Sequence, residues 1–114
     1  MPLVGNFHLA VEESGATSYL RLEGEFDLAA VGSVESVLDR LFRLPTTRRV
    51  VFDLRRLTFL DAAGLRTIFK AQEGARAGAR ELVVVRPRGI ANRVFTLTRA
   101  GEKLSIVDKP EVRA

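Results

Sequence analysis

Few side chains in this chain could do chemistry. It has no cysteine and a single histidine, His8, so thiolate catalysis, disulfides and cysteine-based metal sites are excluded. His8 lies in an alternating segment with no Ser or Asp partner close in sequence, which favours a surface histidine over a catalytic one. Asp53 and Asp61 could serve acid–base chemistry or bind a metal, but Asp53 is expected to end a strand and Asp61 to cap a helix. The residues therefore favour a protein that is not an enzyme and has no metal or other cofactor.

The segment from 57 to 65 is the most distinctive part of the sequence. It is apolar up to Leu60 and continues with Asp61, Ala62, Ala63 and Gly64 at the expected first turn of a helix. Small side chains leave the backbone N–H groups of a helix start accessible, so a partner backbone or an anion could approach closely. Tight packing of this turn against the sheet explains the same residues equally well. The sequence also lacks a glycine-rich dinucleotide loop and a phosphate-binding loop ending in Gly-Lys-Ser/Thr.

The elements that must position this segment begin with a hairpin. Apolar and polar residues alternate over residues 7–13 and again over 19–24, which is the period of half-buried strands. Residues 14–16 have the composition of a turn. A short turn between two such runs predicts an antiparallel pair.

A helix and a buried strand are expected next. After Asp27 the apolar residues recur every three or four positions, and Pro45 ends the pattern. The residues expected on the buried side are Ala30, Val34, Leu38 and Leu41, and those on the exposed side are Ser36, Asp39, Arg40 and Arg43. Residues 48–54 are rich in β-branched and aromatic side chains, which predicts a central strand buried on both faces.

A second helix is expected to begin at Asp61 after a turn, and to end at Gly78. Helical spacing places Leu65, Ile68, Phe69 and Gln72 on its buried side, and Ala63, Arg66, Thr67 and Lys70 on the other side.

The last part of the chain predicts three short elements. A strand is expected at 81–85, a helix marked by Ile90, Val94 and Leu97 and ending near Gly101, and an edge strand at 104–107. The order β-β-α-β-α-β-α-β predicts an α/β fold with a small mixed β-sheet and helices packed on it. The length of 114 residues fits a single domain over residues 1–114.

Composition narrows the classes of partner that the protein is expected to bind. The 18 basic and 14 acidic residues give a net charge of +4, but the arginines are spread along the chain without a basic run. This pattern favours a solvated surface over nucleic-acid binding. No apolar run approaches the roughly 20 residues that cross a bilayer, and the N-terminus lacks the pattern of a signal peptide. We therefore expect a cytoplasmic protein without membrane insertion.

Three segments in register resemble the STAS domain family, which includes bacterial anti-sigma factor antagonists. They are GEFDL at 24–28, VFDL at 51–54 and FLDAAGL at 59–65. The similarity extends from about Tyr19 to Val107 and includes RVFTLT at 93–98. It implies a small sheet flanked by helices, with the start of the second helix, nearby loops and the first helix docking onto a partner. The usual partner is an anti-sigma factor that is also a serine kinase, of the histidine-kinase-type ATPase fold.

The resemblance also implies which residues bind the partner. The expected docking edge is Asp61, Ala62, Ala63 and Gly64, together with Arg66, Thr67 and Lys70 on the same helix and with Ser36 and Arg40 on the first helix. In phosphoregulated members a serine, or sometimes a threonine, follows the aspartate, and the kinase modifies it to break the complex. Ala62 stands at that position and has no hydroxyl, so a phosphate switch cannot operate there.

Other functions stay open at this stage. The chain could be a STAS subunit of a larger signalling assembly, the cytoplasmic accessory subunit of a membrane lipid ABC transporter, or a nucleotide-binding sensor that uses the helix start as a phosphate site. We expect the isolated protein to be a monomer or a weak homodimer.

Overall fold

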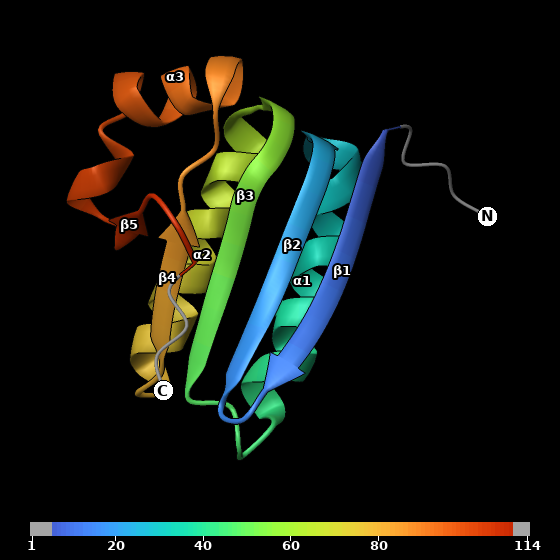
Figure 1. Cartoon of the computed structure of the whole chain (residues 1–114), viewed down its shortest axis with the longest axis vertical. Helices are drawn as coiled ribbons and strands as arrows, with labels where there is room; N and C mark the ends of the chain where they lie inside the picture. Colours follow the sequence, from blue (N-terminus) through green and yellow to red (C-terminus); the bar gives the residue numbers. More distant parts are fainter. Residues whose placement is uncertain (1–5, 111–114) are drawn as a thin grey trace.

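The computed structural model describes residues 6–110, so the ends of the expected domain 1–114 lie outside the described residues. A five-stranded sheet has the order β1-β2-β3-β4-β5, and helices α1 and α2 lie on one of its faces (Figure 1). The strands are β1 Phe7–Ser14, β2 Thr17–Phe26, β3 Arg49–Leu60, β4 Glu81–Val85 and β5 Ile106–Val107. The helices are α1 Leu28–Arg43, α2 Ala62–Ala77 and α3 Gly89–Leu97, followed by a 3₁₀ turn at Ala100–Glu102.

The topology confirms the predicted α/β fold with a mixed sheet. Strands β1 and β2 pair antiparallel, and β2 with β3, β3 with β4, and β4 with β5 pair parallel. Each parallel pair is joined by a helical crossover, as parallel neighbours require. Strand β3 is central and β5 is an edge strand, both as expected.

The core lies between the sheet and the layer of α1 and α2. The four apolar residues expected on the buried side of α1 are all buried, as are Leu65 and Ile68 of α2. They face the inward side chains of the sheet, such as Leu20 and Phe52, which are fully buried. Burial of this apolar surface supplies the main driving force for the fold.

The expected turn after Leu54 does not exist, because β3 continues to Leu60. Its last part pairs with the end of β2, with Gly24 opposite Leu57 and Phe26 opposite Leu60. Register shifts interrupt the pairing between Arg21 and Glu23 and again between Gly24 and Glu25. These irregularities break the alternation of apolar and polar residues that identifies a strand, which is why the charged stretch of β3 resembles a turn. Asp53 therefore lies within a strand and does not end it.

The apolar residues that mark α3 in the sequence do not form its buried face. Ile90 and Leu97 are 69% and 79% exposed, whereas Ala91 and Phe95 are buried. Phe95 offers the largest apolar surface of this short helix, and it is the residue that turns inward. The helix ends at Leu97, and the last strand shrinks from the expected residues 104–107 to Ile106–Val107.

The second face of the sheet is free of α1 and α2 (Figure 1). Over β3 and β4 its side chains Val51, Val83 and Val85 are nevertheless buried. Over β1 and β2 it carries exposed charged side chains, among them Glu12 and Arg21. We call the part over β1, β2 and β3 the open face.

Candidate functional site

One carboxylate holds the starts of two helices together. Asp61 is the N-cap of α2, and its Oδ1 accepts a hydrogen bond from the Gly64 N–H at 2.8 Å. Its Oδ2 accepts a second hydrogen bond, at 3.3 Å, from the N–H of Leu28, the first residue of α1. Helix α1 has its own cap, Asp27, which accepts from the Ala29 N–H at 3.0 Å. The predicted cap at Asp61 is confirmed, and the link to α1 is new.

Packing explains one of the small residues of this turn. Gly64 is buried, and a Cβ added to it would lie 2.6 Å from the Phe26 carbonyl oxygen and 2.8 Å from Leu60 Cδ1. Only glycine fits between these neighbours without a shift. Ala62 in contrast is exposed, and Ala63 is half-buried. Tight packing of the turn therefore accounts for Gly64, whereas the accessible helix start is found at Ala62.

The expected exposure of Thr67 is wrong. Its side chain is 3% exposed, and its hydroxyl donates a hydrogen bond to the Ala63 carbonyl oxygen at 2.9 Å. Helix α1 packs against α2 and lines a groove with it, in which Thr67 and Leu38 take part. Burial by a neighbouring helix cannot be derived from the periodicity of one helix alone.

The remaining predicted residues on the helices are exposed but do not all lie together. Arg66 is exposed one turn into α2, and Lys70 lies one turn further, with its Nζ 3.4 Å from Glu35 Oε2 on α1. Ser36 and Arg40 are also exposed. Since Ser36 follows Glu35, it lies at the level of Lys70, roughly 12 Å along α1 from Leu28 at 1.5 Å per residue. They belong to the middle of the helical layer, away from the start of α2.

Three exposed apolar side chains that no sequence pattern predicted come from segments at the end of the sheet where α1 and α2 begin. Leu28 is 73% exposed and follows β2, Phe59 is 42% exposed near the end of β3, and Ile90 is 69% exposed in the helix after β4. They therefore lie beyond or near the carboxyl ends of parallel strands, which meet at one edge of a sheet. Large apolar residues beside helix caps were the available signal, but Ile90 was used only as a marker of the third helix.

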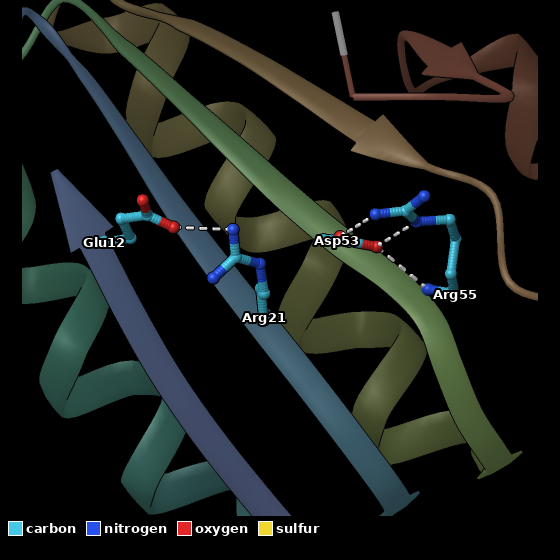
Figure 2. A network of polar contacts seen from close by, with 4 residues as sticks. All are labelled: Glu12, Arg21, Asp53 and Arg55. Carbon is cyan, nitrogen blue, oxygen red and sulfur yellow. Dashed lines mark hydrogen bonds and ion pairs between the residues drawn. The ribbon is translucent and has the colours of Figure 1, made fainter. Parts of the chain in front are cut away.

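The open face carries a separate polar network (Figure 2). Asp53 is 6% exposed, and it accepts hydrogen bonds from the Arg55 backbone N–H at 3.1 Å, from Arg55 Nε at 3.0 Å and from Nη2 at 2.8 Å. On the neighbouring strands, Arg21 Nη2 donates to Glu12 Oε1 at 2.6 Å. Both arginines are thereby held in fixed positions on the sheet surface.

The pKa of Asp53 reflects opposing effects. Burial, the largest single contribution, raises the pKa of this carboxyl group. The hydrogen bonds from the Arg55 side chain and backbone lower it, and so do the positive charges of Arg55 and Arg21. Together these contributions hold the pKa of Asp53 below its ordinary value, so the group is a carboxylate at neutral pH.

Two further features bear on function. Among residues 6–110, no three His, Asp or Glu side chains come together in a way that could hold a metal ion. Over the same part of the chain, no helix has the length and apolar character needed to cross a membrane.

A mixed five-stranded sheet with α1 and α2 on one face makes this chain an α/β domain. The chain belongs to the STAS domain family, whose sequence model matches residues 8–111. This confirms the resemblance seen in the sequence.

Solved structures agree with this fold. An anti-sigma factor antagonist from Mycobacterium paratuberculosis has a TM-score of 0.79 and 22% identity, over 90% of this chain and 86% of that chain. The anti-sigma factor antagonist SpoIIAA in its unphosphorylated form has a TM-score of 0.70 and 20% identity, over 91% and 89% of the two chains. The Bacillus cell fate determinant SpoIIAA in its phosphorylated form has a TM-score of 0.69 and 20% identity, over 88% and 91%.

Proposed function

We propose that this chain is a non-enzymatic regulator of the anti-sigma factor antagonist type, which binds an anti-sigma factor that is also a serine kinase. The binding surface is the end of the sheet where α1 and α2 begin, and we call it the docking end. It consists of Leu28, Phe59, Asp61, Ala62, Ala63, Arg66 and Ile90. The observation that carries the proposal is the exposure of Leu28, Phe59 and Ile90 at this one end.

The chemistry of the docking end suits a protein partner. Exposed apolar side chains at one end of a domain mark interaction sites, because burying them in a complex is favourable. Both oxygens of Asp61 already accept hydrogen bonds from Leu28 and Gly64. Asp61 therefore shapes the surface, while Ala62 and Ala63 allow a partner backbone to come close.

The charged residues of the helical layer have a secondary role in this proposal. Arg66 borders the docking end and would face an acidic patch on the partner. Lys70, Ser36 and Arg40 lie farther along the helices, and Lys70 already contacts Glu35. They extend the contact only for a partner that also covers α1.

Regulation at the usual position is excluded by Ala62. This residue is exposed at the first position of α2, where a hydroxyl group would be accessible to a kinase. With alanine there, the complex is constitutive or is controlled at another residue. The nearest hydroxyl groups belong to Thr58, which is exposed, and to Thr67, which is buried and hydrogen-bonded.

Affinity capture from the native cell extract tests the proposal. The bait is the wild-type protein, compared with the double variant Leu28→Ser and Phe59→Ser, and with Leu97→Ser as a control that is equally exposed but lies at the other end of α3. A histidine-kinase-type ATPase retained by the wild type and by the control, but lost from the double variant, is the expected result. Retention of transporter subunits, or of a large assembly of STAS proteins, would overturn it.

A further inference from the structure

The open face contains a hollow of about 400 Å³ that no part of the proposed function uses. We call it the sheet hollow. The side chains that matter for its chemistry are Ala10, Arg21, Glu23, Asp53, Arg55 and Arg56. It lies on the opposite side of the sheet from α1 and α2. We propose that the sheet hollow binds the phosphate group of a small molecule.

The register of the sheet creates the hollow. Ala10 on β1 lies opposite Arg21 on β2, and Arg21 in turn lies opposite Asp53 on β3. Ala10 is the small member of this row, between the larger His8 and Glu12 on the same strand face. Arg21 hydrogen-bonds to Glu12, and Asp53 is bound by Arg55. The small side chain of Ala10 between these groups leaves space above the strands.

Two arginines at the sheet hollow are paired with carboxylates, and the part-buried pair of Arg55 with Asp53 is held more firmly than the exposed pair of Arg21 with Glu12. Arg55 uses Nε and Nη2 to bind Asp53, which leaves Nη1 outside that pair. Arg21 uses Nη2 to bind Glu12, which leaves Nε and Nη1 outside that pair. A guanidinium that is already held in place loses little conformational entropy when it binds a ligand. Fixed guanidinium groups are the side chains best suited to bind phosphate oxygens.

The charges around the sheet hollow are balanced, because its three arginines stand against Glu23, Asp53 and Glu12, the last bound to Arg21. Asp53 directs both oxygens to Arg55, and the exposed Arg56 on β3 lies opposite the exposed Glu23 on β2. An anion would therefore be held by the guanidinium N–H groups that lie outside these pairs, and not by a net positive charge. The volume exceeds that of a bare phosphate ion, so an ester group also fits.

Calorimetric titration tests the proposal, with inorganic phosphate and glycerol 3-phosphate as probes and chloride at equal ionic strength as the blank. The wild type should bind at least one of them saturably. Stronger binding of the ester identifies a phosphate monoester as the ligand class, and equal binding identifies the free ion. Replacing Arg55 or Arg56 by Gln should weaken binding about tenfold. Glu23→Gln should strengthen it, because the repulsive charge is gone.

Matched controls separate this site from general attraction to a basic protein. Arg99 and Glu102 form an exposed pair in another part of the chain, so Arg99→Gln and Glu102→Gln make the same charge changes away from the sheet hollow. Both should leave binding unchanged, and circular dichroism confirms that each variant is folded. If Arg55→Gln does not fold, the exposed Arg56 supplies the test. Absence of saturable binding to the wild type, or equal weakening by Arg99→Gln, would overturn the proposal.

Discussion

The Asp61 carboxylate accepts a hydrogen bond from the Leu28 N–H at 3.3 Å while it caps α2 through Gly64. Residues 33 positions apart are thus joined at the two helix starts. A carboxylate is favoured near helix N-termini, where backbone N–H groups lack partners within the helix. The geometry of the docking end therefore depends on a single side chain.

Replacing Asp61 by alanine should destabilise the fold by about 1–2 kcal/mol, since loss of an N-cap alone costs about 1 kcal/mol and the Leu28 N–H loses its partner too. Asp61→Asn keeps an oxygen acceptor and should lose less. Chemical denaturation of the three proteins measures the difference. An Asp61→Ala variant as stable as the wild type would contradict the assigned hydrogen bonds.

Changes at Ala62 should separate binding from stability. Ala62→Asp places a negative charge in the first turn of α2, which stabilises the helix by about 0.3–1 kcal/mol. The same charge on the docking end should weaken capture of the partner. Ala62→Ser should instead restore a hydroxyl that the captured kinase can phosphorylate, as detected by mass spectrometry. Unchanged partner binding by Ala62→Asp would remove this residue from the interface.

Replacing each of two glycines by alanine should change the stability of the protein in opposite directions. Gly64→Ala should destabilise the protein by about 1–3 kcal/mol, because the new Cβ overlaps the Phe26 carbonyl oxygen and Leu60. Gly32 in α1 has nothing within 4 Å of the added Cβ. Gly32→Ala should therefore stabilise the helix by about 0.5–1 kcal/mol. Thermal unfolding of both variants checks the sign of each change.

Acid should weaken the fold in part through Asp53. Its pKa in the folded state lies below the ordinary value, so its contribution to the free energy of unfolding is complete above that value. The contribution is lost as the pH falls through the pKa of the folded state. Asp53→Asn should lower the free energy of unfolding at pH 7. It should also make that free energy decrease less steeply as the pH falls. Chemical denaturation of the wild type and of Asp53→Asn at neutral and acidic pH measures the difference.

Local patterns predicted most of the fold. The alternation in β1 and β2, the spacing of Ala30, Val34 and Leu38, and the caps at Asp61 and Gly78 all depend on neighbours in sequence. The length of β3 could not be predicted, because its second half is a strand only through pairing with β2 beyond a register shift. The face of α3 depends on which side chain the sheet can accommodate, and Phe95 fills that space.

The start of α2 was predicted from the sequence, but its surroundings were not. Asp61 is the N-cap of α2 and Ala62 is its first residue, as expected. Thr67 is buried because α1 covers it, and Lys70 meets Glu35 of the same helix. Leu28, Phe59 and Ile90 come from three separate segments. Only the parallel arrangement of the strands brings these segments to one end, and a linear pattern does not contain that information.

The sequential strand order also determines how the sheet can grow during synthesis. In the order β1-β2-β3-β4-β5, each strand pairs with the one made just before it. A chain that emerges from the ribosome N-terminus first can therefore add every new strand at one edge, without inserting it between existing strands. Besides the outer edge of β1, each unfinished chain exposes the edge of its newest strand, which the next strand then covers. A pause after β3 would leave the central strand exposed, which makes residues 61–80 the segment whose delay most favours aggregation.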